Sequence, residues 1–394
     1  MNSYDVVIVG GGAIGSSVAY HLATEPTFNA KVMVVEQDPT YQSCSTALSW
    51  GGIRQQFSTR ECIAMSAYGL EFYRNAQKLL RVEDQVPELG FVEGGYLLLA
   101  PESSREAVRR SFELQRSCGV AVQWLEPAQI AERFPEINID GVGSATFGHR
   151  NEGWIDPMSL LSALKRKARS LGVDFVKDEV VDLLCGQTSV RGVRLQQRGD
   201  VDTRVVVNAA GTRAAQISAM AGIELPIGPQ RLVTFVFDCE RPVNHPALTE
   251  DISGVILRPE GSRYLAGLAP GPNDNPFSHD FDIDYSVFEE QIWPALAHRF
   301  PVFEAIKLNS AWAGHLDYNH FDQNAFIGKH PHADGLLLAN GFSGHGLQHS
   351  PAAGRALMEL IVFGDYRSLD LGRLGVQRLL DNQPIQETYI LGVS

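Results

Sequence analysis

The chain has 394 residues, too many for one ordinary domain, and this length predicts two or three cooperating units. Apolar residues make up 44% and charged residues 20% of the chain, a globular composition that excludes a disordered, collagenous or coiled-coil protein. The formal net charge is −13 and no block of Lys or Arg interrupts it, so we expect no nucleic-acid partner.

The cysteines and the apolar runs bear on the cellular compartment of the protein. Five cysteines, an odd number, occur without CxxC or Cys/His metal spacing, so they read as reduced thiols and predict no metal site. No run approaches the ~18 consecutive apolar residues that a membrane helix needs, and no charged leader precedes an apolar segment. We therefore expect a cytoplasmic enzyme without a transmembrane segment.

The first 36 residues have the pattern of one βαβ unit. A β-branched run at 6–9 precedes the G-x-G-x-x-G motif of residues 10–15, and a second strand at 32–35 ends at Glu36, close to the expected ~20 residues after the motif. The first glycine permits a tight turn, the second lets a pyrophosphate approach the backbone, and the third lets the helix pack on the strand. Glu36 can accept hydrogen bonds from a ribose diol, which disfavours NADP and leaves FAD and NAD.

Two later segments favour FAD. The strand pattern at 205–207 closes on small residues at Ala210 and Gly211, as expected where a strand passes beneath a dinucleotide. A second buried strand at 335–340 leads through a glycine-rich turn into a helix predicted at 347–362. This second junction suits FAD, which must be held at both ends, and its helix N-terminus would stabilise negative charge on the reduced flavin ring.

The intervening segments predict a different kind of domain. Strand patterns at 94–100, 232–237, 255–257 and 264–268 include one probable hairpin, and residues 270–280 read as an exposed loop. The predicted fold class is α/β (α+β overall), a Rossmann-like FAD-binding domain built from discontinuous segments plus a mostly antiparallel β-sheet substrate domain. The FAD-binding domain is assigned residues 1–85, 146–220 and 326–394, and the substrate domain 86–145 and 221–325.

Several longer strings add a family resemblance. They are residues 48–58, 95–100, 152–157, 312–319 and 321–324. With the glycine-rich junctions, they make the chain similar to the D-amino-acid oxidase and sarcosine oxidase (DAO) superfamily of FAD-dependent amine oxidoreductases over almost its whole length. More narrowly, the strings resemble the branch of FAD-dependent oxidoreductase domain-containing proteins linked to respiratory complex I assembly.

The resemblance implies a set of cofactor-binding positions. These positions would contact the ADP half, the pyrophosphate and the flavin of FAD, and the Val180 backbone would pair with the adenine. They are Gly10, Gly12, Ala13, Ile14, Gly15, Glu36, Gln37, Ser43, Ser45, Ser49, Trp50, Gly51, Gly52, Val180, Ala210, Gly211, Gly314, Gly341, Gly344, His345, Gly346 and Leu347. Relatives attach FAD through a cysteine near the position of His315 or a histidine at the position of Gly51. Because neither residue type is present at its position, we expect non-covalent FAD.

The resemblance also implies amine oxidation. In such enzymes a neutral amine gives a hydride to flavin N5, and the resulting imine of the amino acid or amine hydrolyses. Arg54 and Arg258 are the candidates for holding a substrate carboxylate. His315 and His345 are candidate polar groups for steering a proton. The electron acceptor stays open between O₂, a quinone and an electron-transfer protein.

Two other functions are retained as alternatives. The narrower resemblance favours an assembly or chaperone-like flavoprotein in which FAD is mainly structural. An NAD-dependent dehydrogenase is the other alternative, because the first βαβ unit alone does not separate NAD from FAD.

Overall fold

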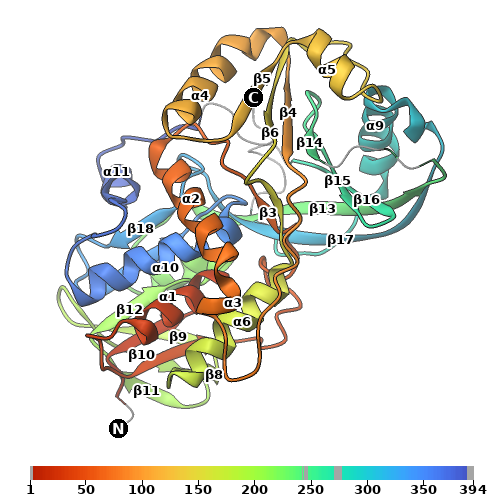
Figure 1. The fold of residues 1–394 in the computed structure, drawn as a ribbon. Coiled ribbons are helices and arrows are strands. Elements are labelled where there is room, and N and C mark those ends of the chain that lie inside the picture. The colour runs from red at the N-terminus through yellow and green to blue at the C-terminus, as the bar shows by residue number, and fades with distance from the viewer. Residues whose placement is uncertain (1–2, 242, 244–246, 270–276, 388–394) are drawn as a thin grey trace.

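The computed structural model describes residues 3–241, 243, 247–269 and 277–387. Over these residues the strands form a six-stranded sheet, an eight-stranded sheet, and sheets of three and two strands. The six-stranded and eight-stranded sheets lie in different halves of the molecule (Figure 1). The predicted α/β class, with a parallel sheet and an antiparallel-rich sheet, is confirmed.

The six-stranded sheet, here called the parallel sheet, is assembled from distant parts of the chain. Its order is β18 (Phe326–Lys329), β19 (Leu336–Asn340), β12 (Val205–Asn208), β1 (Val6–Val9), β2 (Val32–Glu36) and β8 (Asp174–Lys177). All neighbours are parallel except β18, which runs antiparallel to β19. The β-branched run of β1 is buried on both faces, as is typical of a central parallel strand.

Alternate residues of β1 point into separate cores. Val6 and Ile8 pack with helix α1 (Ala13–Thr24), which lies beside α10 (Gly346–Val362) and α6 (Pro157–Ser170). Val7 and Val9 pack on the other side of the sheet. That side is covered by α7 (Ala214–Ala219) and by a three-stranded antiparallel sheet. The sheet consists of β9 (Val180–Cys185), β10 (Val190–Leu195) and β11 (Gly199–Asp202), and it was not predicted from the sequence.

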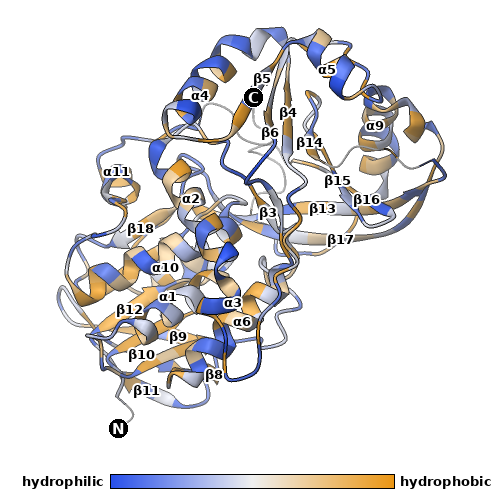
Figure 2. Cartoon of the chain, in the orientation of Figure 1, coloured by the Kyte–Doolittle hydropathy of each residue, from blue (hydrophilic) through white to orange (hydrophobic). Residues whose placement is uncertain are grey.

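The eight-stranded sheet, here called the antiparallel sheet, has a single parallel pair, β14 with β4, over the described residues. Its order is β17 (Ile306–Asn319), β13 (Ile227–Cys239), β16 (Arg263–Leu268), β15 (Val255–Glu260), β14 (Leu248–Glu250), β4 (Tyr96–Ala100), β6 (Ser144–Gly148) and β5 (Val122–Leu125). The predicted hairpin is confirmed as β15 and β16. Helices α4 (Arg105–Ser117), α5 (Pro127–Arg133) and α9 (Trp293–Arg299) lie around this sheet, and α4 and α5 carry hydrophilic residues among their hydrophobic ones (Figure 2).

Shorter elements complete the structure. They are β3 (Gly52–Ile53), which pairs with β7 (Gly153–Trp154), and helices α2 (Arg60–Arg74), α3 (Ala76–Leu79), α8 (Tyr285–Val287) and α11 (Gln377–Leu380). Helix α2 packs on α10. Its Tyr73 hydroxyl donates to the Leu347 carbonyl at 2.9 Å, an acceptor left without its helical donor because Pro351 has no N–H.

The structure bears on two assignments made from the sequence, a domain boundary and a loop. The predicted division at residues 145/146 falls inside β6, whose residues all pair with β4 in the antiparallel sheet. We therefore propose that the segment 86–148 belongs with the antiparallel sheet. The predicted loop at 270–280 includes residues 270–276, which lie outside the described residues.

No described helix is both long enough and apolar enough to cross a membrane. The described His, Cys, Asp and Glu side chains do not gather in a group that could hold a metal ion, and the five cysteines form no disulfide.

Candidate active site

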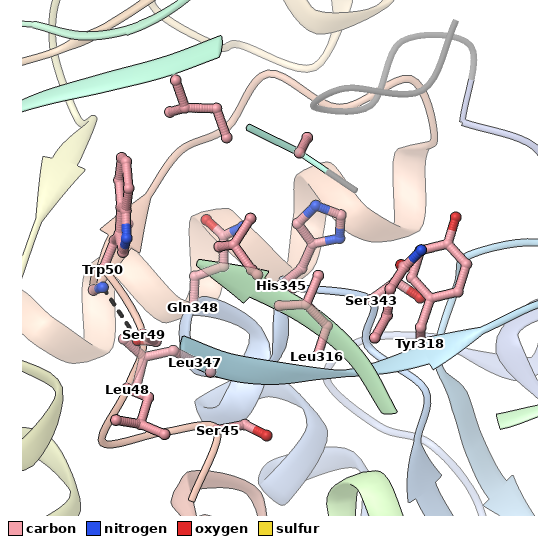
Figure 3. A pocket seen from close by; sticks show the side chains of 18 of the residues that line it. Ser45, Leu48, Ser49, Trp50, Leu316, Tyr318, Ser343, His345, Leu347 and Gln348 are labelled. Carbon is pink, nitrogen blue, oxygen red and sulfur yellow. Dashed lines mark hydrogen bonds between the residues drawn. The ribbon is translucent and has the colours of Figure 1, made fainter. Parts of the chain in front are cut away.

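Two adjoining cavities lie between the parallel sheet and the antiparallel sheet. The first, which we call the dinucleotide cleft, runs past the N-termini of α1 and α10. The residues that line it come from the segments 10–14, 36–49, 209–213, 279–281, 315–317 and 342–347. The second, the inner pocket, continues toward the antiparallel sheet (Figure 3). Both cavities share Ser45, Ser49, His315, Leu316, Gly344 and Leu347, so they form one continuous space.

The α1 end of the cleft is built from glycine backbone. Gly10 has φ +98°, and a Cβ there would lie 2.4 Å from the Ala209 carbonyl oxygen. A Cβ on Gly15 would lie 1.9 Å from the Gly10 carbonyl oxygen. The N-cap of α1, Gly12, has no side-chain cap, so this helix presents its positive N-terminal end to the cleft.

Glu36 stands at the end of β2 beside this helix N-terminus. Its carboxylate accepts hydrogen bonds from the backbone N–H of Gly11 at 2.8 Å and of Asp38 at 2.9 Å. Partial burial raises the pKa of Glu36, and the two N–H donors oppose this shift. The backbone therefore fixes an acidic group on the wall of the cleft.

The α10 end is built from a turn that side chains support. Gly341, Ser343 and Gly344 have positive φ values of +75°, +50° and +95°. The Asp317 carboxylate accepts hydrogen bonds from the N–H groups of Gly341 at 2.9 Å and Phe342 at 3.1 Å. Desolvation raises the pKa of Asp317 to about 6. The turn presents the uncapped N-terminus of α10 to both cavities.

Arg54 is a buried cation that lines the inner pocket. Its Nη2 donates to His345 Nε2 at 2.9 Å, and its guanidinium lies over the Phe57 ring, 4.4 Å from the centroid. The Arg54 backbone N–H donates to Gln348 Oε1 at 2.8 Å. No carboxylate of the described residues lies within ion-pairing distance of this guanidinium.

His345 is neutral in this arrangement. Burial and the nearby Arg54 charge hold the pKa of His345 well below its usual value, and its ring also bonds the Phe342 backbone carbonyl. Since Nε2 accepts from Arg54, the ring proton is on Nδ1, where it can donate to that carbonyl. His345 therefore positions Arg54 and is not placed as a charged acid.

Glu152 lies behind Arg54, in the string 152–157. Its carboxylate accepts from the Gln55 N–H at 2.7 Å and from Gln56 Nε2 at 2.7 Å, and it is fully buried. Burial raises the pKa of Glu152 to about 7, opposed by these hydrogen bonds and by the Arg54 charge. Glu152 thus holds the backbone next to Arg54 and carries a charge that changes near neutral pH.

Comparison with known proteins assigns the chain to a family. The model of the FAD dependent oxidoreductase (DAO) family matches residues 5–360. The chain belongs to this family. It is 40% identical over 423 residues to FAD-dependent oxidoreductase domain-containing protein 1 of Xenopus laevis, covering 98% of this chain and 85% of that protein. It is 27% identical over 374 residues to glycine oxidase of Bacillus licheniformis, covering 91% and 93%.

Solved structures give the same fold. L-proline dehydrogenase from P. horikoshii aligns with a TM-score of 0.86 at 24% identity, covering 98% of this chain and 100% of that one. Membership of the FAD dependent oxidoreductase family implies FAD binding, so the NAD alternative is not supported.

The residues present fit FAD. The cleft offers two uncapped helix N-termini, at α1 and α10, for the negative charge of a pyrophosphate and of a reduced ring. Glu36 supplies acceptors for a ribose. His315 Nε2 is buried without a hydrogen-bond partner among the described residues and lines the cleft, as expected where a bound group supplies the partner.

The structure brings most of the predicted cofactor residues to these cavities. Those that line at least one cavity are Gly10, Gly12, Ala13, Ile14, Glu36, Gln37, Ser43, Ser45, Ser49, Trp50, Gly51, Gly52, Ala210, Gly211, Gly314, Gly344, His345, Gly346 and Leu347. Gly15, Val180 and Gly341 line neither. Gly15 packs on Gly10, Gly341 bonds Asp317, and Val180 lies in the core beneath the parallel sheet.

One predicted catalytic residue, Arg258, lies away from the cavities, whereas His315 lines both of them. The Arg258 guanidinium is engaged by the Trp50 carbonyl and the Glu260 carboxylate, and Arg258 lines neither cavity. The ring of His315 packs edge-on against Phe281, with centroids 4.6 Å apart. Of the predicted pair of arginines, the structure brings only Arg54 to the inner pocket.

Several pocket residues were not predicted. They are Gln230, Leu232, Leu248, Ile256 and Gln348. Gln348 lines the inner pocket with Trp50, Leu316 and Tyr318 (Figure 3). Gln230 and Leu232 are two residues apart on β13, so an alternating strand pattern was the one available signal. The Tyr318 hydroxyl is buried without a hydrogen-bond partner among the described residues.

Proposed function

We propose that this protein uses non-covalently bound FAD to oxidise the C–N bond of an α-amino acid or a related amine that carries a carboxylate. The observation that carries the proposal is Arg54, a buried guanidinium on the wall of the inner pocket with no carboxylate partner among the described residues. A buried cation without a counter-ion is costly unless a ligand supplies one. The relative named glycine oxidase supports an amino-acid substrate.

Arg54 is prepared for a planar anion. A guanidinium fork binds a carboxylate through two parallel N–H···O bonds, which fixes the orientation of the substrate as well as its position. His345 and Phe57 hold the guanidinium plane, and Gln348 holds the Arg54 backbone. The Tyr96 side chain also lines the pocket, next to Gly52.

The charge of the inner pocket selects the protonation state of the amine. Among its lining residues Arg54 alone carries a permanent charge, and the pKa values of His315 and His345 are lowered by burial. A substrate ammonium would meet a cation and no carboxylate, so the pocket favours the neutral amine. The chemistry that FAD supplies when bound is acceptance of a hydride from the carbon next to that amine, which leaves an imine that water hydrolyses.

Non-covalent binding rests on the side chains near the cleft. Glycine stands at position 51, and burial raises the pKa of the Cys44 thiol, which disfavours a reactive thiolate. Acid precipitation should release the yellow cofactor into the supernatant. Colour that stays in the pellet would show a covalent bond, with His315 Nε2 the first position to examine.

The test is anaerobic reduction of the purified holoprotein. Amino acids and N-methyl amino acids should bleach the flavin band, and the Arg54→Met substitution should lower the second-order rate by about 10²–10³-fold because a desolvated charge pair is lost. Arg263→Met, which removes an exposed arginine of β16, is the matched control and should keep the wild-type rate. A holoprotein that no amine bleaches would instead favour the assembly role with structural FAD. Adding air, a quinone or an electron-transfer protein to the reduced enzyme would then identify the acceptor.

A further inference from the structure

The wall of the inner pocket opposite the cofactor cleft is one face of the antiparallel sheet. Tyr96 pairs with Leu248 in the register of β4 and β14. On β13, Leu232 pairs with Gly314 of β17. Because side chains alternate between the faces of a sheet, paired positions and positions two apart share a face. The strand register therefore gathers Tyr96, Leu248, Ile256 and Leu232 on the same wall.

This wall is apolar and rigid. Tyr96, Leu248 and Ile256 are buried members of one hydrophobic cluster, against which Trp50 and Ala269 also pack. The Trp50 ring is held in place because its Nε1 donates to Thr234 Oγ1 at 2.7 Å and because Gly267 leaves it room, with a Cβ there lying 3.3 Å from the ring.

The charged groups near the wall are engaged elsewhere or lie outside the lining. Arg258 shares this face but is held by Glu260 and the Trp50 carbonyl. Glu250 is buried at the position that pairs with Ile256, and it does not line the pocket. Among the described residues that line it, the pocket thus presents one cation, Arg54, and an apolar wall, with neither a second cation nor an anion.

We propose that the substrate is a monocarboxylate amine with an apolar side chain, which lies against the wall formed by Trp50, Leu232, Leu248, Ile256 and Ala269. This inference rests on the proposed function, because it takes Arg54 as the carboxylate site. A second carboxylate on the substrate would be buried without a cation, and a basic side chain would be buried without an anion. An apolar arm loses only its contact with water, which is favourable.

Binding of unreactive carboxylates tests this without turnover. Acetate, butanoate, hexanoate and succinate are titrated into the holoprotein by calorimetry. We expect the dissociation constant to fall by about fourfold for each added CH₂ from acetate to hexanoate, as complete burial of the chain implies. Succinate should bind more weakly than butanoate. A flat series, or succinate binding as tightly as butanoate, would overturn the inference.

Two variants separate this inference from the proposed function. Leu232→Asn should leave the affinity for acetate unchanged and reduce the increase in affinity from acetate to hexanoate. The conservative Leu232→Ile should keep that increase in affinity. Leu171→Asn, at an exposed position outside the pocket, is the control. Arg54→Met should weaken all the carboxylates together. If Arg54→Met has no effect, the carboxylate site and the proposed function fail; if it acts but the chain-length series is flat, only the apolar substrate class fails.

Discussion

The two ends of the dinucleotide cleft have the same arrangement of elements but are stabilised by different interactions. At each end a strand leads through a glycine-rich turn into a helix whose N-cap has no side-chain cap. At α1 the turn depends mainly on close backbone packing, with Gly15 against Gly10, and the Glu36 carboxylate accepts a hydrogen bond from its Gly11 N–H. At α10 it is held by side chains, because Asp317 binds the turn and Arg54 binds His345. The first end is thus sensitive to added volume, and the second to lost hydrogen bonds and to pH.

The largest effect is expected from adding one carbon at the α1 end. Alanine normally stabilises a helix relative to glycine, but a Cβ at position 15 would lie 1.9 Å from the Gly10 carbonyl oxygen. Gly15→Ala should therefore destabilise the protein by about 3 kcal/mol and abolish FAD retention, measured by denaturant unfolding and by flavin absorbance. Gly12→Ala is the matched substitution, since its nearest neighbour is 3.3 Å away. It should fold and yet bind FAD weakly; equal damage from both would show that the glycines serve packing only.

At the α10 end, removing the acceptor of Arg54 should weaken carboxylate binding. His345→Leu leaves a buried charged donor without its partner, which costs about 1.5–3 kcal/mol, equivalent to about 10–100-fold in the dissociation constant for acetate. His345→Gln, which offers an amide oxygen as acceptor, should recover part of the affinity. Unchanged binding in His345→Leu would show that Arg54 is positioned without this contact.

The same end should also be acid-sensitive. Burial and the Arg54 charge lower the pKa of His349 to about 3, and its Nε2 lies 2.9 Å from Ser66 Oγ. Between pH 6.5 and 5 the unfolded chain takes up a proton at this histidine and the native state does not, so stability falls as the pH falls. The loss is about 2 kcal/mol over this interval. His349→Gln should flatten the dependence by this amount in denaturant midpoints at the two pH values; identical slopes would contradict the assignment.

The smallest effect concerns the charge behind Arg54. The pKa of Glu152 is raised to about 7, so its carboxylate gains a negative charge as the pH rises through neutrality. That charge reduces the positive potential at Arg54, and acetate should bind severalfold more weakly at pH 8 than at pH 6. Glu152→Gln should bind acetate equally well at both pH values. A pH dependence that survives the substitution would have to come from another group.

The two ends also differ in how far the sequence alone predicts them. Glycine spacing reveals the α1 end because backbone clashes depend on neighbours a few residues away. The contact of Arg54 with His345 joins residues 291 positions apart, and no local pattern encodes it. Arg54 and Arg258 looked equivalent in the sequence. Their surroundings distinguish them, because Arg258 is held by Glu260 and by the distant Trp50 carbonyl and lines neither cavity.

The fold was more predictable than the pocket. Buried apolar runs marked β1, β2, β12 and β19, because strands covered on both faces leave a strong signal. The three-stranded sheet after Val180 was missed, since its exposed polar positions resemble a loop. The predicted domain division at 145/146 falls inside β6, and strand pairing with β4, rather than a change in composition, supports our proposal that these residues belong with the antiparallel sheet.

The strand order of the parallel sheet bears on how the protein is made. Strand β1 leaves the ribosome before its neighbour β12, which begins at Val205, and long before β19, which pairs with β12 and begins at Leu336. During synthesis the edge of β1 therefore stays unpaired until β12 emerges, and the edge of β12 stays unpaired until β19 emerges. We expect cofactor loading to be a post-translational event, and nascent chains arrested before residue 340 to emerge colourless.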